Sequence, residues 1–458
     1  EGGAGTLFSF SSKGRRELPD AHVLMDGAIE PLSKAGSFIG QHIYTPVRGA
    51  ALHINAFNFP VWGMLEKLAP TLLAGVPAIV KPASATSYLT EAGFRVMSVS
   101  GVLPTGAVEL IVGGVGDLFD HLGGQDVVSF TGSASTALKL RTHPVVQRES
   151  VKFIAEQDSL NASLLGPDAA PGSPEFDLFV TEVVNEMTVK AGQKCTAIRR
   201  AMAPAEHLDA LEAAMRDRLA DTKVGDPRDK DSRMGALVSL SQRDDVRTQI
   251  GKLTASGARI VAGDPDAALG VAGGAFMEPI LLRTDDPWAN AAVHDCEAFG
   301  PVSTVMPYRD ITDAVALANR GMGSLVLSLF THSPDAAREF VQGAAASHGR
   351  MLVLNRDNGA DSTGHGSPLP VLVHGGPGRA GGSEEMGGVR GVKHYMQRTA
   401  IQSTPAMIAA ISEQYIPGGP KHEIATHPFR KRMSELEIGD TLKTKSRTVT
   451  IADIEHFA

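Results

Sequence analysis

A thiol and a carboxylate are the two side chains of this sequence whose chemistry is most informative. Cys195 lies in the segment Lys190-Ala-Gly-Gln-Lys-Cys-Thr-Ala-Ile-Arg-Arg200, and Glu156 closes the apolar run Val151-Lys-Phe-Ile-Ala-Glu156. A free thiol is a soft nucleophile that adds to a carbonyl carbon, and a carboxylate in an apolar setting can activate water. The pair therefore predicts a two-step reaction that passes through a thioester.

The neighbours of Cys195 help to separate a nucleophile from a packing residue. A lone cysteine is more often a small buried hydrophobe. Gln193, Lys194 and Thr196 instead make the setting polar, and nearby positive charge favours the thiolate. We therefore expect Cys195 to be a nucleophile, and we assign a packing role to the second cysteine, Cys296.

Composition limits the class of protein. The 458 residues exceed what one hydrophobic core holds, which predicts two or three domains. A hydrophobic content of 43% and a charged content of 21% are ordinary for a globular protein. The formal charge of −8 argues against a nucleic-acid partner and against attraction to anionic membranes.

Several sequence features bear on compartment and metal content. No apolar run is long enough to span a membrane, and the first residues do not resemble a secretory leader. Two cysteines cannot form a disulfide framework and fit a reducing compartment, which predicts a cytoplasmic protein. The chain starts with Glu1 rather than Met, so we expect its true start to be missing. Spacings such as His-Glu-x-x-His or paired Cys-x-x-Cys are absent, so no metal site is predicted.

Residues 47–158 alternate between strand-like and helix-like segments. The helices are expected at Val61–Leu73 and Tyr88–Ser100. Near-continuous apolar strands between helices indicate a parallel sheet covered on both faces, and strand ends in such sheets carry ligand loops. The expected strands are Ala50–Ala56, Pro77–Lys81, Ala107–Val112, Asp126–Phe130 and Val151–Ala155.

The region 159–388 repeats this α/β theme with longer helices. Helices are expected at His207–Asp221 and Asp244–Ser256, and strands at Ser324–Phe330 and Met351–Asn355. The glycine-rich stretch Val373–Gly382 predicts a flexible connector near a site or an interface.

Five short strings carry a resemblance to the aldehyde dehydrogenase superfamily. They occur in the family's order and approximate spacing, and the match extends from residue 28 to 405. Each string alone is weak, but five in register are specific. The strings are Asn58–Trp62, Lys81–Ser84, Phe130–Ser133, Gly192–Cys195 and Glu297–Pro301.

The resemblance implies a domain organisation. A Rossmann-like cofactor domain is expected at 1–27 and 47–158, and an α/β catalytic domain at 159–388. Residues 28–46 and 389–405 resemble the arms through which family members pair by sheet extension, which implies a homo-oligomer. Residues 406–420 are expected to form a linker, after which 421–458 form an incomplete further domain.

The tail from about residue 420 resembles the beginning of MaoC-like enoyl-CoA hydratases of the hot-dog fold. Such a fusion is similar to bifunctional ring-opening enzymes of phenylacetate degradation, whose dehydrogenase domain oxidises a CoA-linked semialdehyde with NADP. The resemblance therefore implies a CoA-thioester semialdehyde as substrate and a bifunctional protein. The hydratase's catalytic Asp and His are expected beyond Ala458, so the chain alone is not expected to open the ring.

The resemblance also implies roles for the catalytic residues. Cys195 corresponds to the nucleophile, and Asn58 to the amide that stabilises the oxyanion together with the Cys195 backbone N–H. Asn58 can alternatively cap a helix that begins near Pro60. Glu156 corresponds to the base that hydrolyses the thioester. The family usually continues with Leu-Gly-Gly, whereas this chain has Gln157-Asp158-Ser159. If Asp158 lies close to Glu156, like-charge repulsion raises the pKa of Glu156.

Cofactor binding is assigned by the same resemblance. Phe130, Gly132 and Ser133 correspond to the start of a helix whose backbone N–H groups suit a pyrophosphate. Lys81 corresponds to the lysine that holds the adenosine ribose, and Glu297 and Phe299 to the pair at the nicotinamide ribose and ring. NAD-preferring relatives often have Glu where this chain has Ser84, so we predict NADP rather than NAD. The cluster Gly113-Gly-Val-Gly116 is interpreted as a turn.

Two alternatives to hydrolytic dehydrogenation stay open at the level of sequence. An acylating enzyme would release the thioester to CoA, although it has less need of Glu156. A non-catalytic scaffold would keep the fold only to hold hydratase domains together. The unusual Gln157-Asp158 pair favours the scaffold, whereas the intact set of Cys195, Asn58, Lys81 and Glu297 favours an enzyme.

Overall fold

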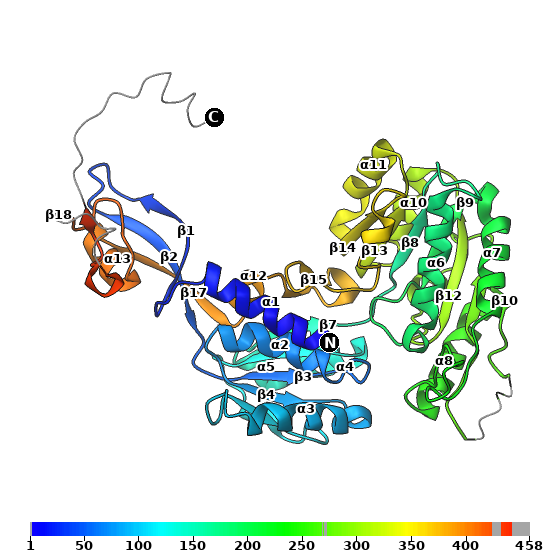
Figure 1. Ribbon diagram of the computed structural model, residues 1–458, viewed down its shortest axis with the longest axis horizontal. Helices are drawn as coiled ribbons and strands as arrows, with labels where there is room; N and C mark the ends of the chain where they lie inside the picture. The colour runs from blue at the N-terminus through cyan, green and yellow to red at the C-terminus, as the bar shows by residue number, and fades with distance from the viewer. Residues whose placement is uncertain (1, 268, 270–272, 424–431, 442–458) are drawn as a thin grey trace. The chain divides into compact units, whose positions relative to one another are not determined.

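The computed structural model describes residues 2–267, 269, 273–423 and 432–441 (Figure 1). They form two compact units. The first contains Val47–Tyr395 with the N-terminal residues up to Gly14, and the second contains Arg15–Pro46 and the residues from Met396 on. No helix in these described ranges is both long enough and apolar enough to cross a bilayer.

A five-stranded parallel sheet occupies the first part of the larger unit. Its order is β5-β4-β3-β6-β7, and the five strands predicted from the sequence are confirmed to within three residues at either end. The strands are β3 (Ala51–Ile54), β4 (Ala78–Lys81), β5 (Val108–Leu110), β6 (Val127–Thr131) and β7 (Lys152–Glu156).

Helices cover both faces of this sheet because its side chains alternate between two apolar clusters. Leu52, Ile54, Val128 and Phe130 pack with residues of α4 (Ala134–Arg141) and α5 (Pro144–Arg148). On the other face, Ala78 and Val80 pack with α2 (Trp62–Leu73) and α3 (Ser87–Val99). The N-terminal helix α1 (Gly2–Glu17) lies along α2, where its small residues Gly3 and Gly14 meet Leu65 and Leu73.

The order of these strands creates a topological switch point. The chain enters at the central β3, adds β4 and β5 on one side, and then crosses to β6 and β7 on the other. Ligands of open α/β sheets bind at the carboxyl ends of the strands beside such a point. The loops after β3 and β6 therefore occupy the place where a ligand is expected.

A seven-stranded sheet forms the second part of the same unit. Its order is β10-β11-β12-β9-β8-β13-β14, with β10 antiparallel to β11 and the other neighbours parallel. The predicted strands 324–330 and 351–355 are β13 and β14. The bounds are β8 (Ala162–Leu165), β9 (Arg200–Pro204), β10 (Arg259–Ala262), β11 (Ile280–Arg283), β12 (Val302–Tyr308), β13 (Ser324–Phe330) and β14 (His348–Leu354).

Successive residues of these strands enter opposite cores, as a strand period of two requires. Leu165 and Phe330 pack with α6 (Pro174–Thr188) and α7 (Leu208–Ala220). Their neighbours Leu164 and Leu329 pack on the other face with α8 (Leu240–Ala255), α10 (Ile311–Asn319) and α11 (Pro334–Ala344). Apolar residues on both faces explain the near-continuous apolar runs in the sequence.

The predicted helices are present, and one begins earlier than expected. The helix expected at 207–221 is α7. The helix expected at 244–256 is α8, which starts at Leu240 because the Ser239 hydroxyl accepts a hydrogen bond from the Gln242 N–H. A serine at this position satisfies a backbone donor that the helix itself leaves unpaired.

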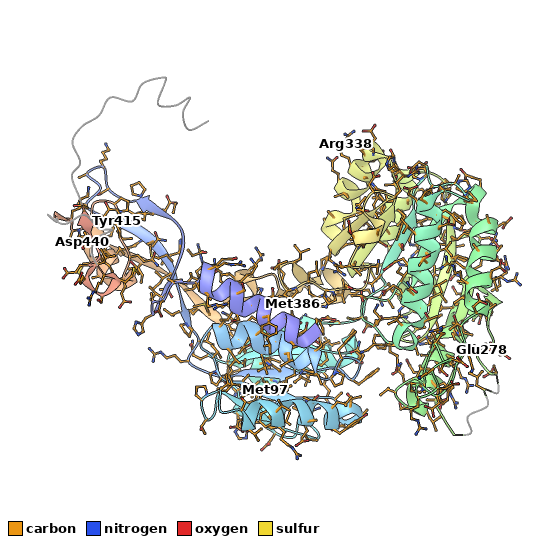
Figure 2. All side chains as sticks on the ribbon, in the orientation of Figure 1. Met97, Glu278, Arg338, Met386, Tyr415 and Asp440 are labelled. Carbon is orange, nitrogen blue, oxygen red and sulfur yellow. The ribbon has the colours of Figure 1, made fainter. Side chains whose placement is uncertain are left out.

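The glycine-rich segment 373–382 is not the flexible connector that its composition predicted. Val373–Gly376 forms β15, which pairs with β16 (Ser383–Met386) in an antiparallel hairpin. A Cβ at Gly375 would lie 2.2 Å from the Ser383 carbonyl oxygen, so glycine permits the close approach. Met386, labelled in Figure 2, is buried at the end of β16. The hairpin is therefore a packed element, and its residues reach the site described below.

The smaller unit contains a three-stranded antiparallel sheet of order β1-β2-β17. Its strands are β1 (Leu24–Pro31), β2 (Ile39–Pro46) and β17 (Met396–Ser403), and α13 (Pro405–Ser412) packs with Ile39 and Ile401. Most of the segments 28–46 and 389–405 thus pairs within one chain, in this sheet. The short helix α12 (Val389–Lys393), which precedes β17, belongs to the larger unit.

The predicted start of a hot-dog domain lies largely outside the described residues. Of 421–458, the structure describes only 421–423 and 432–441. These contain two short parallel strands, β18 (His422–Glu423) and β19 (Asp440–Thr441).

Arg200 gives a test of the larger unit. Its fully buried guanidinium donates to the carbonyl oxygens of Leu160, Leu317 and Ala318 at 2.8–3.1 Å. We expect Arg200→Ala to lower the free energy of unfolding by about 3 kcal/mol or more, because several buried acceptors lose their donor. Urea denaturation followed by circular dichroism measures it. Arg218→Ala, on the exposed side of α7, should change stability by less than about 0.5 kcal/mol, and equal effects would contradict the assignment.

Candidate active site

Four strand ends of the five-stranded sheet place predicted site residues at one edge. Lys81 is the last residue of β4 and Glu156 the last of β7, while Asn58 follows β3 and Gly132 follows β6. Because the strands are parallel, their carboxyl ends meet at the same edge. The sheet therefore gathers residues that are far apart in the sequence.

Cys195 lies in a tight loop that requires unusual backbone angles. The loop follows the short helix η3 (Val189–Gly192), in which Lys190, Ala191 and Gly192 have φ of 57°, 51° and 63°. A Cβ on Gly192 would lie 2.1 Å from the Gly300 carbonyl oxygen. Glycine is therefore needed at 192, and the backbone before Cys195 is held in a strained region.

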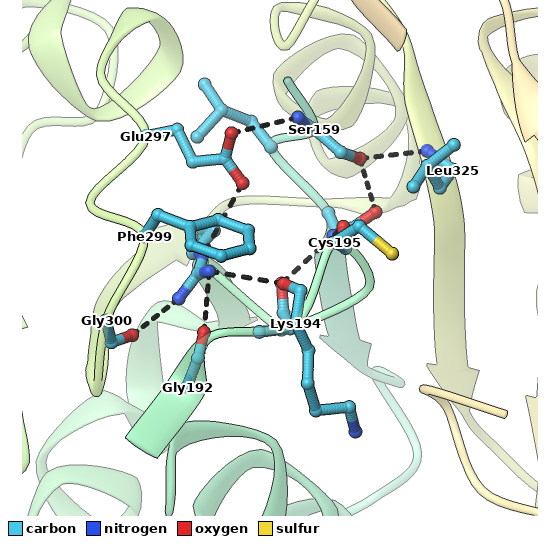
Figure 3. A network of polar contacts seen from close by, with 12 residues as sticks. Ser159, Gly192, Lys194, Cys195, Glu297, Phe299, Gly300 and Leu325 are labelled. Carbon is cyan, nitrogen blue, oxygen red and sulfur yellow. Dashed lines mark hydrogen bonds and ion pairs between the residues drawn. The ribbon is translucent and has the colours of Figure 1, made fainter. Parts of the chain in front are cut away.

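Two buried side chains fix this loop by binding its carbonyl oxygens. Arg199 donates to the carbonyls of Gly192, Lys194 and Gly300 at 2.7–3.3 Å (Figure 3). Asn161 donates to the carbonyl of Cys195 at 2.7 Å. Neither residue was identified from the sequence as part of the site. Their hydrogen bonds hold the backbone that presents the thiol.

Cys195, Glu156 and Asn58 line the same narrow cavity. Asn55 also lines it, and its buried amide nitrogen and oxygen have no hydrogen-bond partner within the described ranges. Unpaired buried amide groups are costly, which marks Asn55 as a candidate ligand contact that the sequence did not reveal. The remaining lining residues are Ala56, Phe59, Trp62, Gly63, Glu66 and Thr131.

Glu156 is held by positive charge. Its carboxylate Oε2 lies 3.1 Å from Nε2 of His374 on β15, and both side chains are at most 3% exposed. Burial raises the pKa of Glu156, but His374, Lys67 and contact with the Cys195 thiol together outweigh burial and lower the pKa to about 2. The carboxylate is therefore ionised at neutral pH.

The pKa of the Cys195 thiol shifts in the opposite direction from that of Glu156. Burial raises the pKa of Cys195 well above its usual value, and the negative charges of Glu156, Glu66 and Glu297 add to the rise. The expectation that local positive charge favours the thiolate is wrong. Lys194 points away from the sulfur (Figure 3). Its ammonium pairs with Glu186 at 2.5 Å. In this arrangement the proton stays on sulfur.

A buried cluster of charged side chains lies next to Glu156. The Lys67 ammonium lies 2.8 Å from both carboxylate oxygens of Glu385, 2.8 Å from the Thr131 hydroxyl and 3.4 Å from Glu66. Burial alone would lower the pKa of Lys67, but these carboxylates raise it above its usual value. A buried charge persists only when paired. The cluster thereby keeps a permanent cation near Glu156.

Asp158 does not act on Glu156 as its sequence position suggested. Its Oδ1 accepts a hydrogen bond of 2.8 Å from the Ala134 N–H, at the first residue of α4. The pKa of Glu156 falls rather than rises, so the hypothesis of like-charge repulsion by Asp158 is wrong. An anion at a helix N-terminus is favourable. Asp158 thus takes one of the donors that the predicted pyrophosphate site would use.

The other predicted cofactor residues lie around the same sheet edge. Ser84 is exposed in η1 (Ser84–Thr86), three residues beyond Lys81, and burial lowers the pKa of Lys81. Phe130 is a core side chain, and a Cβ on Gly132 would lie 2.7 Å from its ring. Ser133 caps α4 through the Thr136 N–H. The nearby Phe130 ring explains why a glycine is needed at position 132.

Glu297 and Phe299 lie in the segment before β12 of the seven-stranded sheet, close to the Cys195 loop. Glu297 accepts a hydrogen bond from the Ser159 N–H at 3.2 Å, and its Oε1 lies 3.8 Å from Arg199 (Figure 3). Burial raises the pKa of Glu297 to about 7, against the effect of Arg199. The Phe299 ring packs edge-on against Phe57, 5.8 Å between centroids.

Asn58 does not cap a helix. The cap position of α2 is Val61, and no side chain there accepts a capping hydrogen bond. The alternative role of Asn58 is therefore wrong, which leaves its amide available to the cavity. The Asn58 carbonyl oxygen instead accepts a hydrogen bond from Lys190, whose ammonium lies 3.5 Å from the centre of the Phe59 ring.

Comparison with known proteins agrees with this geometry. The model of the aldehyde dehydrogenase family matches residues 21–401. The chain belongs to the aldehyde dehydrogenase family. The fold predicted from the five sequence strings is thereby confirmed, and the match ends before the tail that resembles a hydratase.

Two curated proteins are similar to this chain over different lengths. A 3,4-dehydroadipyl-CoA semialdehyde dehydrogenase of Aromatoleum evansii is 47% identical over 378 residues, which are 81% of this chain and 73% of that protein. Protein MaoC of Klebsiella aerogenes is 54% identical over 225 residues, which are 49% of this chain and 67% of that protein. An alignment of 225 residues is far longer than 421–458, so it lies mainly in the aldehyde dehydrogenase region.

Solved structures of an aldehyde dehydrogenase and of an oxidoreductase show the same fold. Betaine aldehyde dehydrogenase of Staphylococcus aureus in complex with NAD+ superimposes with a TM-score of 0.75 at 24% identity, over 88% of this chain and 75% of that one. An oxidoreductase of Marinobacter aquaeolei gives 0.74 at 23% identity, over 88% and 78%. At this identity the likeness concerns the fold.

The residues that sequence reasoning missed had weak signals. Glu66 and Lys67 are two charges inside the otherwise apolar helix α2, which is buried along most of its length. A charged pair in such a helix indicates a buried ionic contact. His374 lies in the glycine-rich segment that was expected near a site, but no spacing linked it to Glu156, 218 residues earlier.

The raised pKa of the Cys195 thiol leads to a kinetic prediction. Glu156→Gln removes a negative charge beside Cys195, so the pKa of the thiol should fall. We expect the rate of Cys195 alkylation by iodoacetamide at pH 8 to rise about tenfold, the change in thiolate fraction for a shift of one pKa unit. Mass spectrometry of the labelled peptide against pH measures it.

The matched control for this measurement is Glu182→Gln, which changes a carboxylate that is not among the charges raising the pKa of Cys195. It should leave Cys195 labelling unchanged. Labelling that is equally slow in Glu156→Gln and in the unaltered protein would show that Glu156 does not suppress the thiolate.

Proposed function

We propose that the protein oxidises a CoA-linked semialdehyde to the carboxylic acid, with NADP as hydride acceptor and a thioester on Cys195 as intermediate. The observation that carries this proposal is the convergence of the Cys195 thiol, the Glu156 carboxylate and Asn58 on one cavity. Membership of the aldehyde dehydrogenase family supports the reaction class. The 47% identity to a 3,4-dehydroadipyl-CoA semialdehyde dehydrogenase supports the substrate class.

The first half of the reaction forms a carbon–sulfur bond. The Cys195 thiol releases its proton to solvent, and the sulfur attacks the aldehyde carbon. The carbonyl oxygen becomes an oxyanion, for which the Asn58 amide and the Cys195 backbone N–H are preset donors. A nicotinamide cofactor, which Lys81, Glu297 and Phe299 would hold, would supply the oxidant that accepts hydride from this carbon. The carbon then remains on Cys195 as a thioester.

The second half breaks the thioester with water. Glu156 removes a proton from a water molecule that attacks the thioester carbon, and the same oxyanion donors stabilise the tetrahedral intermediate. The Cys195 thiolate leaves and regains a proton. His374 holds one oxygen of Glu156, so the carboxylate keeps its orientation through both halves.

We propose 3-oxo-5,6-dehydrosuberyl-CoA semialdehyde as the substrate, formed in the complete protein by ring opening of oxepin-CoA. The resemblance of the sequence 421–458 to MaoC-like hydratases and the 54% identity of part of the chain to protein MaoC of Klebsiella aerogenes support this pairing of activities. The domain divisions given above, a cytoplasmic location, and a homo-oligomer joined through the arm segments and hydratase domains belong to the same proposal. β1 and β17 are the outer strands of the three-stranded sheet in the part of the chain that the structure describes, and outer strands are where pairing by sheet extension takes place.

The proposed choice of NADP depends on Ser84 and Lys81. A serine beside a cation admits a 2′-phosphate, whereas a carboxylate repels it. Ser84→Glu should lower kcat/KM for NADP by at least about tenfold and change kcat/KM for NAD much less, because like charges a few ångströms apart repel by more than about 1 kcal/mol. Initial rates with both cofactors measure it.

Ser100→Glu, on the exposed end of α3, provides the control and should leave the cofactor ratio unchanged. A clear preference of the unaltered protein for NAD would reject the argument from Ser84.

The reaction itself is tested by cofactor reduction with CoA-linked and simple aldehydes side by side. We expect faster turnover with the CoA-linked semialdehyde and none with Cys195→Ala. Reduction that persists in Cys195→Ala would exclude the thioester route. Absence of any reduction in the unaltered protein would favour the non-catalytic scaffold.

Glu156→Gln separates the two halves of the reaction. Because Glu156 activates the hydrolytic water, the variant should release one equivalent of NADPH quickly and then turn over about 100-fold to 10,000-fold more slowly, the usual loss for a general base. Rapid-mixing absorbance shows the burst, and intact mass shows an acyl group on Cys195. If added CoA rather than water removes that group from the unaltered enzyme, the acylating alternative is correct.

A further inference from the structure

Three potential metal ligands from three separate segments lie close together, and two of them, Glu156 and Cys195, line the cavity. The three are the carboxylate of Glu156 at the end of β7, the thiol of Cys195 after η3, and the imidazole of His374 in β15. One ligand atom from each lies within 4.8 Å of the other two. Glu156 and His374 are buried, and Cys195 is partly exposed. The group is therefore enclosed on the protein side and open on the side of the thiol.

Two of these ligand-bearing side chains have unsatisfied atoms. Glu156 Oε1 and His374 Nε2 are buried and make no hydrogen bond of acceptable geometry to the described residues. Nε2 faces Glu156 Oε2 at 3.1 Å, a contact that needs a cation, either a proton or a metal, between two electron-rich atoms. A buried polar atom without a partner costs about 1–3 kcal/mol. The contact therefore needs a proton between Glu156 and His374, and a metal ion bound by all three groups can replace that proton.

The donor set selects the type of cation. Thiolate, imidazole and carboxylate are the ligands that Zn²⁺ uses, at about 2.0–2.3 Å from the ion. Three protein ligands with a fourth, open position are typical of accessible zinc sites. A hard cation such as Mg²⁺ prefers oxygen ligands and would not favour the sulfur.

A second group of carboxylates nearby provides an internal contrast. Glu66, Glu156 and Glu385 also lie within 4.8 Å of one another. The Lys67 ammonium, however, already lies 2.8 Å from both oxygens of Glu385 and 3.4 Å from Glu66. That group is neutralised by Lys67, whereas the group of Cys195, Glu156 and His374 holds only protons, which a metal ion can displace.

We propose that Cys195, Glu156 and His374 form a binding site for Zn²⁺ that reversibly masks the nucleophile. Binding forms bonds from zinc to the sulfur, the carboxylate and the imidazole. It releases to solvent the thiol proton and the proton shared by Glu156 and His374, with no change of oxidation state. The fourth position faces the cavity that also contains Asn58 and Trp62. Zinc therefore excludes the aldehyde carbon from the sulfur. This inhibition rests on the proposed function, whereas binding of the ion does not.

Co²⁺ is the spectroscopic probe for this site. A thiolate bound to Co²⁺ gives a charge-transfer band in the near ultraviolet, and Zn²⁺ should abolish the band by displacement. We expect one Co²⁺ per chain with this band in the unaltered protein, and no band in Cys195→Ala. The matched control, Cys296→Ala, removes the other thiol and should keep the band.

The histidine ligand distinguishes a built site from simple thiol binding. Loss of a neighbouring group around a metal ligand weakens binding about 10-fold to 100-fold, so loss of a direct ligand in His374→Phe should weaken Zn²⁺ binding by at least about 100-fold. Isothermal titration measures it. His332→Phe, at an exposed position, should leave the affinity unchanged. If His374→Phe does not fold, as judged by circular dichroism and thermal melting, His374→Gln replaces it.

A third readout does not depend on catalysis. Zn²⁺ should protect Cys195 from iodoacetamide while Cys296 keeps its labelling rate. A Co²⁺ complex without a thiolate band, or equal Zn²⁺ affinity in His374→Phe and the unaltered protein, would overturn the proposal. A protein that binds Zn²⁺ as proposed but reduces no cofactor with any aldehyde would refute the proposed function and leave the metal site standing.

Discussion

The ionised carboxylate of Glu156 is the interaction on which the site depends. It is buried, and burial alone opposes a charge there. His374 on one side and Lys67 behind it supply the compensation, and Lys67 is in turn held by Glu385 and Glu66. Removing one member of such a set leaves another buried charge without a partner, which is why the members act together.

The two sheets of the larger unit supply this arrangement from different directions. Glu156 and Lys67 come from the five-stranded sheet and its covering helix, whereas Cys195 comes from a loop of the seven-stranded sheet. Arg199 and Asn161 fix that loop through its carbonyl oxygens, so the thiol is positioned by backbone rather than by its own contacts. The hairpin β15–β16 adds His374 and Glu385, which pair with residues of the first sheet. The chemistry therefore requires a packed hairpin where composition indicated a loose connector.

Sequence periodicity was sufficient for the sheets because burial on both faces leaves apolar runs. The strand 324–330 was predicted with its observed bounds, since all seven side chains are buried. Helix α8 was placed four residues late because its start depends on the Ser239 side chain rather than on apolar periodicity. The hairpin at 373–386 could not be predicted, because Gly375 matters through a backbone contact that exists only after folding.

The site was predicted only as far as its motifs reach. The residues that resemble a known family lie at the cavity or around the same sheet edge, with Cys195, Glu156 and Asn58 in one cavity. Their ionisation could not be read from neighbours in sequence. Lys194 is adjacent to Cys195, yet its ammonium pairs with Glu186, while the carboxylate of Glu156 reaches the thiol from 39 positions away. The ionisation of a group depends on which charged groups lie near it in the folded protein. The sequence shows which charged residues are present but not which of them are close together.

The pairing of an ionised carboxylate with a neutral thiol has a further consequence. A thiol whose pKa is raised by burial and negative charge is a poor nucleophile, and it is also poorly reactive toward oxidants and alkylating agents. Positive charge brought close to the sulfur would reverse this, because an opposite charge favours the ionised form. The oxidised nicotinamide ring carries such a charge, and so does a divalent cation. The same deficit of positive charge at the sulfur would make the proposed nucleophile dependent on a bound cofactor, and it would attract the thiophilic ion proposed above.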